Sequence, residues 1–264
     1  MSKILAIANQ KGGVGKTTTS VNLAASFAAT RRRILLIDLD PQGNATMGSG
    51  VDKRELELSS YEVLLEGTPV TAARQSLQDT GYDLLAANDD LTAADMALLE
   101  EDGRELKLKS ALAPVIVDYD YVIIDCPPAL NMLTINALVA ANSVIIPTQC
   151  EYYALEGLSS LLSTVEKIRK LLNPGLQIEG LLRTMFDPRN NLANQVSAQL
   201  LEHFGEKVYR TVIPRNVRLA EAPSHGLPAL LYDKASSGAT AYLALAGEML
   251  RRDESALGLR GKLQ

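Results

Sequence analysis

The chain has 264 residues, of which 47 % are hydrophobic and 22 % are charged, and its formal net charge is −5. This is enough for one large α/β domain with a substantial core, expected over residues 1–264, without a second domain. The only cysteines, Cys126 and Cys150, argue against a secreted disulfide scaffold. The first residues lack the apolar stretch of a signal peptide, and no apolar run approaches the ~20 residues that span a bilayer. We therefore expect a soluble, cytoplasmic protein.

The charge is unevenly distributed along the chain. A net charge of −5 taken alone argues against nucleic acid as a partner. However, the segment from Lys207 to Arg218 carries four basic side chains and no acidic one. The segment from Asn88 to Asp102 is strongly acidic, and we interpret it as the solvated face of a helix. The average charge therefore does not exclude a local basic surface.

Apolar runs that are typical of buried parallel strands alternate with helical patterns. This alternation predicts βαβ units with right-handed crossovers, and hence a mostly parallel, twisted sheet covered by helices on both faces. In such a sheet the ligand site lies beyond the C-terminal ends of the strands. A further strand-like run precedes Pro214, and Gly258 and Gly261 predict a frayed tail over 253–264. The predicted strands are Lys3–Ala8, Ile34–Asp38, Asp83–Ala87, Tyr121–Asp125, Ser143–Pro147 and Ile178–Phe186.

The first predicted strand runs into N-Q-K-G-G-V-G-K-T-T, Asn9 to Thr18, and the helix-forming run Val21–Ala29 follows. The phosphate-loop pattern G-x-x-x-x-G-K-[ST] matches this segment except at its first glycine, where Gln10 stands. Its glycines let successive backbone N–H groups turn toward one anion, and the following helix adds its positive dipole end. The sequence therefore predicts a phosphate site formed by Gly12, Gly13, Val14 and Gly15.

Three side chains of this loop suit a nucleotide with Mg²⁺. Lys16 would contact the β- and γ-phosphates, and the Thr17 hydroxyl would bind Mg²⁺. Thr18 could donate a further hydrogen bond to the α-phosphate. No function within one chain is evident for Lys11, because Lys16 and the backbone N–H groups of the loop would already contact the phosphates.

Three aspartates lie at predicted strand ends, where the edge of the sheet meets the loop. Asp125 ends Y-V-I-I-D, which places a carboxylate near the Mg²⁺ region opposite the phosphate loop. Asp38 and Asp40 alternate at another strand end, so both face the same side if the strand continues. The chemistry predicted for this set is phosphoryl transfer to water, with positioning and charge neutralisation as the main effects.

Several strings resemble one family along nearly the whole chain. K-G-G-V-G-K-T-T is similar to the deviant Walker A box of the ParA/MinD group of dimeric ATPases. R-I-L-L-I-D-L-D-P-Q-G-N-A-T, Y-V-I-I-D-C-P-P and I-P-R-N-V-R-L-A-E-A-P-S-H-G resemble the chromosomal ParA, or Soj, partition ATPases. The resemblance implies a fold like that of the P-loop NTPases, with ATP and Mg²⁺ as cofactors.

The resemblance also implies roles for individual residues. Lys11 would reach across a homodimer to the partner's phosphates, as an arginine finger does, and would act with Lys16 and Asp40 in catalysis. Asp40 corresponds to the carboxylate that orients the attacking water. Asp38 would support the metal and the loop, and Asp125 corresponds to the Walker B aspartate, so the implied metal set is Thr17, Asp38 and Asp125.

Two further sets follow from the resemblance. Pro214, Arg215 and Asn216 form the turn that holds adenine, since Asn216 can donate to and accept from the base edge. Arg189 and Arg218 match positions that the Soj group uses on DNA. Contacts from such loops to phosphates do not read sequence, which fits non-specific binding to double-stranded DNA.

The implied function is ATP-dependent DNA partitioning. The ATP-bound dimer would bind DNA on the nucleoid, and a ParB/Spo0J-type centromere-binding protein would trigger hydrolysis and release. The alternative is a MinD-like positioner of cell division on a membrane surface, but the ending S-A-L-G-L-R-G-K-L-Q has poor membrane affinity. A third possibility, an iron–sulfur protein like the nitrogenase iron protein, would show visible absorption. Free cysteines such as Cys126 and Cys150 more commonly pack as small apolar residues.

Overall fold

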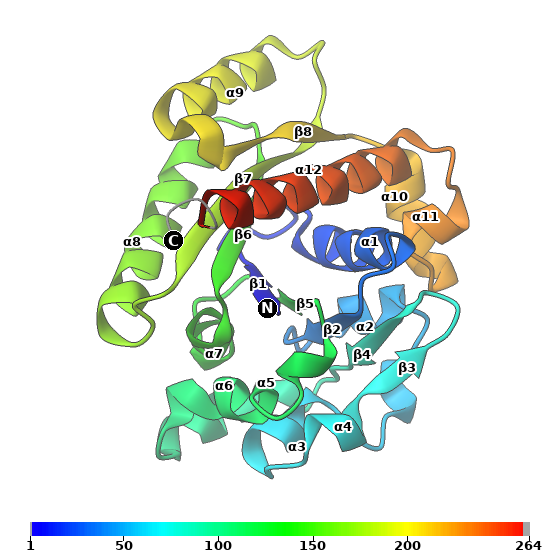
Figure 1. Cartoon of the computed structure of the whole chain (residues 1–264), viewed down its shortest axis with the longest axis vertical. Helices are drawn as coiled ribbons and strands as arrows, with labels where there is room; N and C mark the ends of the chain where they lie inside the picture. The colour runs from blue at the N-terminus through cyan, green and yellow to red at the C-terminus, as the bar shows by residue number, and fades with distance from the viewer. Residues whose placement is uncertain (1, 261–264) are drawn as a thin grey trace.

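A computed structural model describes residues 2–260 of the chain. Its centre is one eight-stranded sheet with the order β3-β4-β2-β5-β1-β6-β7-β8, in which only β3 runs antiparallel to its neighbour (Figure 1). The strands are β1 (Lys3–Ile7), β2 (Ile34–Asp38), β3 (Gln75–Leu77), β4 (Tyr82–Leu85), β5 (Tyr121–Asp125), β6 (Ser143–Gln149), β7 (Gln177–Phe186) and β8 (Val208–Pro214).

Helices cover both faces of this sheet, and each face has its own hydrophobic core. Alternate residues of a strand point to opposite faces, so Ile4 and Ala6 of β1 join one core while Leu5 and Ile7 join the other. The first core is covered by α3 (Ser60–Leu65), α4 (Val70–Ala73), α5 (Leu91–Ala97), α6 (Lys107–Leu112), α7 (Met132–Ala140), α8 (Ala154–Leu171) and α9 (Asn191–Phe204). The second is covered by α1 (Lys16–Ala29), α2 (Asn44–Gly48), α10 (Val217–Glu221), α11 (Ala229–Tyr232) and α12 (Ser237–Arg260).

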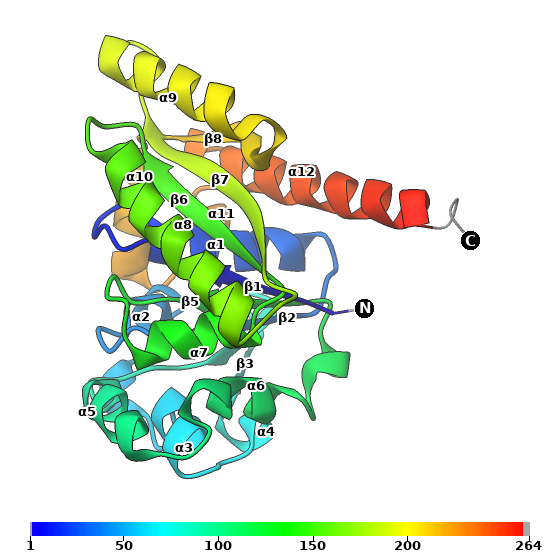
Figure 2. The ribbon, with the colours of Figure 1, turned by 90° about the vertical axis from the view of Figure 1, so that its left-hand side faces the viewer.

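Figure 2 shows α8 and α12 on opposite sides of the strands. This arrangement confirms the predicted class, an α/β fold with a mostly parallel sheet between two helical layers. Short 3₁₀ helices complete the described chain: η1 (Lys53–Glu55), η2 (Leu98–Glu100), η3 (Arg104–Leu106), η4 (Ile116–Asp118), η5 (Gly205–Lys207) and η6 (Ala222–His225).

All six predicted strands are present, with small shifts at their ends. The strand predicted over Asp83–Ala87 begins one residue earlier and ends at Leu85, and the run before Pro214 is strand β8. Strand β3 was not predicted, because three partly exposed residues at a sheet edge carry no periodic signal. In the acidic segment, α5 buries Leu91 and Ala94, and its own carboxylate, Asp95, is half-buried and accepts a hydrogen bond from the Met132 N–H at 2.8 Å. The exposed carboxylates of the segment flank α5 instead: Asp89, Asp90, Glu100, Glu101 and Asp102.

The C-terminal helix α12 runs past Gly258 to Arg260, and fraying of the segment 253–264 stays a prediction. The Asp253 carboxylate accepts hydrogen bonds from Lys3 Nζ at 2.5 Å and from the Tyr121 hydroxyl at 2.7 Å. These contacts fix the helix to the N-terminal ends of β1 and β5. Residues 261–264, the rest of the predicted tail, lie outside the described residues.

Strand register brings the predicted site residues together. In the sheet Asp125 is paired with Ile7 of β1 on one side and with Asp38 of β2 on the other. The chain segments that follow β1, β2 and β5 therefore start side by side at one edge of the sheet. Within residues 2–260, no helix is both long enough and apolar enough to cross a membrane.

Candidate nucleotide-binding site

The segment between β1 and α1 presents a run of free backbone donors. Within residues 2–260, no N–H group from Gly12 to Thr18 donates a hydrogen bond to another protein atom. Gly13 and Gly15 have φ values of 71° and 88°, a left-handed conformation that favours glycine. Helix α1 begins directly after Gly15, so its first N–H groups point out of the same turn. Free donors at a helix N-terminus bind anions, and the loop therefore has the geometry of a phosphate site.

The two lysines of the loop have different surroundings. Lys16 is only 7 % exposed, and its Nζ donates to the Lys11 carbonyl oxygen at 3.2 Å. Burial lowers the pKa of Lys16, although the nearby Asp125 carboxylate opposes this effect. The Lys11 side chain is 39 % exposed, and its Nζ lies 2.6 Å from a carboxylate oxygen of Glu151. Lys11 thus has a surface partner within its own chain, which the sequence did not predict.

Asp125 lies under the start of α1. Its two oxygens accept hydrogen bonds from the Thr17 hydroxyl at 2.8 Å and from the Ser20 hydroxyl at 2.7 Å. Burial, followed by repulsion from Asp38, raises the pKa of Asp125 to about 8, and burial raises the pKa of Asp38 to about 6. The buried carboxylates of Asp38 and Asp125 lie close together and concentrate negative charge. A divalent cation bound beside them would offset this charge.

Asp38 is fully buried, and both of its carboxylate oxygens are occupied. One oxygen accepts from the Asp40 N–H at 3.1 Å, and the other accepts from the Thr46 N–H and hydroxyl at 2.9 and 2.8 Å. Asp38 therefore organises the loop between β2 and α2. Asp40 is 8 % exposed, and its carboxylate accepts from the Gln42 N–H at 3.0 Å.

The carboxylates do not form a complete metal site by themselves. Within the described residues, no group of three His, Cys, Asp or Glu side chains converges as a metal site. The oxygen donors near Asp125 nevertheless fit Mg²⁺, which keeps several waters and takes its remaining ligands from one or two protein groups and from phosphates. Thr17 and Asp125 are the side chains at the right place for such a contact.

A cavity of about 180 Å³ lies next to the loop. The structure places Pro214, Arg215 and Asn216 in its wall, facing Gly15 and Thr18. Asn216 also caps α10: its side-chain oxygen accepts from the Leu219 N–H, and its amide donates to the Ser237 hydroxyl at 2.9 Å. One amide N–H and one oxygen lone pair remain for a ligand. The other lining residues, which were not predicted, are Thr184, Met185, Ile213, Leu219, Ala220 and Tyr242.

Arg189 and Arg218 follow the C-terminal ends of the neighbouring strands β7 and β8. Arg189 is 89 % exposed and makes two hydrogen bonds to the Asp187 carboxylate, at 2.9 and 2.8 Å. Arg218 pairs with Glu221 at 2.7 Å and with Asp233 at 3.3 Å. Exposed pairs of this kind are weak because solvent screens them, so a phosphate can replace the carboxylate.

The basic segment predicted from the sequence is not one patch. Lys207 precedes β8 and Arg218 follows it, so the strand separates their backbones by roughly 20 Å. Only the basic residues after β8 share the edge of the sheet with Arg189.

Several residues of the site were not recognised in the sequence. Asn9 donates to the Pro147 carbonyl at 2.7 Å and accepts from the Lys11 N–H at 2.9 Å, which fixes the start of the loop. The Thr184 hydroxyl donates to the Val14 carbonyl at 2.8 Å and joins β7 to the loop. Asn9 begins the quoted phosphate-loop motif, and Thr184 lies near the end of the predicted strand Ile178–Phe186. The sequence therefore indicated the position of both residues but not their hydrogen-bond partners.

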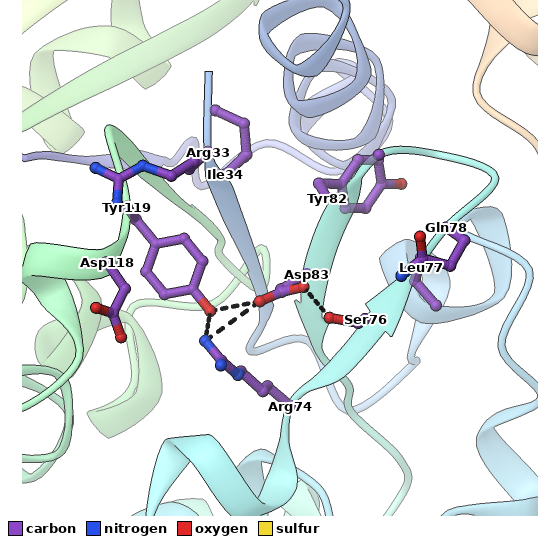
Figure 3. A pocket seen from close by; sticks show the side chains of 11 residues that line it. Arg33, Ile34, Arg74, Ser76, Leu77, Gln78, Tyr82, Asp83, Asp118 and Tyr119 are labelled. Carbon is purple, nitrogen blue, oxygen red and sulfur yellow. Dashed lines mark hydrogen bonds and ion pairs between the residues drawn. The ribbon is translucent and has the colours of Figure 1, made fainter. Parts of the chain in front are cut away.

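A second cavity, of about 380 Å³, lies near the opposite ends of the strands (Figure 3). Its polar groups satisfy one another: Tyr119 and Ser76 donate to Asp83 at 2.6 and 2.5 Å, and Arg74 contacts both Tyr119 and Asp83. These bonds fix β3 to β4 and leave no array of free donors like that of the loop.

Both cysteines are buried in the core that faces α7 and α8. Cys126 is 1 % exposed and Cys150 is 5 % exposed, and burial raises the pKa of the Cys150 thiol to about 11. They pack as small apolar residues.

The fold and the loop together define a phosphate-loop nucleotide-binding protein. The model of a family described as an AAA domain matches residues 2–178. The chain is 54 % identical over 249 residues to the sporulation initiation inhibitor protein Soj of Bacillus subtilis, covering 94 % of this chain and 98 % of Soj. It is 49 % identical over 253 residues to the chromosome partitioning protein ParA of Myxococcus xanthus, covering 96 % and 89 %. A Mycobacterium smegmatis structure named cobyrinic acid a,c-diamide synthase, with bound ADP and magnesium, has a TM-score of 0.85, 40 % identity and 97 % coverage of both chains.

The chain belongs to the ParA/Soj family of chromosome-partitioning ATPases. This confirms the resemblance predicted from its motifs. The family and the phosphate loop both support ATPase activity.

Proposed function

We propose that this protein is a DNA-partitioning ATPase that binds ATP with Mg²⁺ in the loop from Lys11 to Thr18. The observation that carries the proposal is the uninterrupted run of free N–H groups over Gly12 to Thr18, with the buried Lys16 beside it. Such an array would bind the phosphates, while Thr17 and Asp125 would hold Mg²⁺, which neutralises phosphate charge when bound. Pro214, Arg215 and Asn216 would receive adenine. Asp40 would orient the attacking water, and Asp38 would support that segment.

ATP would also join two copies of the chain. Lys11 is exposed at the loop while Lys16 is buried, so only Lys11 can extend toward another molecule. Its pair with Glu151 is exposed and weak, and exchanging Glu151 for a partner's phosphate gains a charge-assisted contact. Lys11 would then act across the interface on the partner's nucleotide.

Lys11→Ala should leave ADP binding to the monomer nearly intact and weaken the ATP dimer, because the missing charge acts across the interface. Light scattering with ATP measures the dimer. Lys107→Ala is the matched control, since Lys107 makes a comparable exposed pair with Glu101 far from the loop. An equal dimer fraction in Lys11→Ala and in the unchanged chain would refute the cross-subunit role.

The dimer would bind double-stranded DNA without sequence preference through Arg189 and Arg218, and so associate with the nucleoid. Both arginines follow the ends of adjacent strands, so they lie at one edge of the sheet. A ParB/Spo0J-type protein, and DNA itself, would stimulate hydrolysis, and dimer opening would release the DNA. The relatives at 54 % and 49 % identity are named for sporulation and chromosome partitioning, which favours this function over a MinD-like role at a membrane.

Two arginines in each chain give four phosphate contacts in the dimer, so its log affinity for DNA should fall with log salt with a slope of about −3.6, and the monomer's with about half of that. Arg189→Ala or Arg218→Ala should each flatten the dimer slope by about 2 and weaken binding equally on unrelated duplexes. Arg54→Ala is the control, because Arg54 makes the same exposed two-bond contact with Asp52. Unchanged slopes, or strong preference for one duplex, would place the DNA surface elsewhere.

A further inference from the structure

Thr46, in the middle of the short helix α2, connects three segments of the chain. The residue is fully buried. Its N–H and its hydroxyl both donate to one oxygen of Asp38, at 2.9 and 2.8 Å. The same hydroxyl oxygen accepts from the Ala87 N–H at 2.9 Å. One hydroxyl thus connects the end of β2, the helix α2 and the chain just beyond β4.

The contact continues from Asp38 to Asp40. The second oxygen of Asp38 accepts from the Asp40 N–H at 3.1 Å, so Thr46 and Asp40 hold the same carboxylate from opposite sides. The turn that follows is tight, because the Gly43 N–H donates to the Asp40 carbonyl at 2.8 Å. Gly43 has a φ of 62°, and a Cβ there would come 2.9 Å from the Ala87 carbonyl oxygen. The backbone of Asp40 is therefore fixed at both of its polar groups.

We propose that Thr46 is a positioning residue for hydrolysis: it orients the buried Asp38 carboxylate, which in turn holds the Asp40 backbone where its side chain can orient water. This inference rests on the proposed role of Asp40. It does not require Thr46 to contact nucleotide, metal or water. A displacement of about 1 Å at a reacting group can lower a rate by up to about a hundredfold, so loss of this hydrogen bond should affect the chemical step more than binding.

A purely structural role for the hydroxyl would give a different result, and a neighbouring residue provides a control for it. Ser49, directly after the helix, is also buried, and its hydroxyl bonds to the Ala45 carbonyl and to the Tyr82 hydroxyl, both at 2.7 Å. Ser49→Ala removes a buried hydroxyl from the same segment without touching Asp38. Any effect that comes only from loosening α2 should appear in both variants.

The test compares Thr46→Val, Thr46→Ala and Thr46→Ser with Ser49→Ala in the full chain. Thr46→Ala and Thr46→Ser differ by the hydroxyl alone, so this comparison remains decisive if Thr46→Val does not fold. The measurements are affinity for a fluorescent ADP analogue with Mg²⁺, single-turnover ATP hydrolysis with DNA present, and thermal unfolding.

We expect Thr46→Val and Thr46→Ala to bind ADP within about threefold of the unchanged chain and to hydrolyse ATP roughly ten- to a hundredfold more slowly. Thr46→Ser and Ser49→Ala should hydrolyse ATP within about twofold of the unchanged chain. Equal rates for Thr46→Ala and Thr46→Ser, or an equal loss in Ser49→Ala, would overturn the positioning role while the proposed ATPase function stands. No hydrolysis by the unchanged chain would overturn both.

Discussion

Lys16→Ala is expected to reduce affinity for ATP and ADP by roughly a hundredfold or more, because it removes the buried cation beside the free N–H groups of the loop. Lys16 is 7 % exposed and lies close to Asp125, so its charge acts in a partly dehydrated site where electrostatic effects are large. Lys11 is not expected to compensate, because its side chain is exposed outside the buried site and is proposed to act on the partner's nucleotide. Titration with a fluorescent nucleotide measures the loss.

Two controls separate this loss from unfolding. Thermal unfolding of Lys16→Ala without nucleotide should show a folded protein, and Lys107→Ala should bind nucleotide normally because Lys107 pairs with Glu101 away from the loop. Normal ATP affinity and turnover in Lys16→Ala would refute the assigned phosphate site.

Asp40→Ala should give the opposite pattern, with nucleotide binding kept and hydrolysis lost. The carboxylate is proposed to orient water in the transition state, and loss of such a group typically lowers the rate about 10²- to 10⁴-fold. ATP should then persist in the site, and the dimer should accumulate. Single-turnover hydrolysis and light scattering with ATP measure the two effects.

The Asp40 carboxylate also accepts a hydrogen bond from the Gln42 N–H, so the substitution loosens a turn. Asp52→Ala controls for this, because Asp52 accepts an equivalent bond from the Arg54 N–H. If hydrolysis in Asp40→Ala is unchanged, the role belongs to another residue, and Asp38 is the next candidate. Asp38 is less suited, since Asp40 and Thr46 already occupy both of its oxygens.

The sequence was informative where the signal is local. Apolar runs such as Tyr121–Asp125 identify buried strands, and a polar residue at the end of a run marks the edge where ligands bind. The phosphate loop is one continuous segment, so its pattern can be recognised in the sequence directly. The alignment of Asp38 with Asp125 follows from parallel strands that end together.

Contacts between distant segments were not predictable, because they depend on register and packing. The partner of Lys11 is Glu151, 140 positions further along the chain, and Val14 is held by Thr184. Helix α12 gives another example, because Asp253 contacts Lys3 and Tyr121, which lie far away in the sequence.

The most direct test is DNA binding by the unchanged chain with ADP, with ATP and with a slowly hydrolysed ATP analogue. In the proposed function only the ATP dimer would bring four arginines to the DNA, so we expect weak binding with ADP, tight binding with ATP and the longest-lived complex with the analogue. Two unrelated duplexes should give equal affinities. Equal DNA affinity in all three nucleotide states, or no binding with the analogue, would contradict an ATP-controlled DNA-binding dimer.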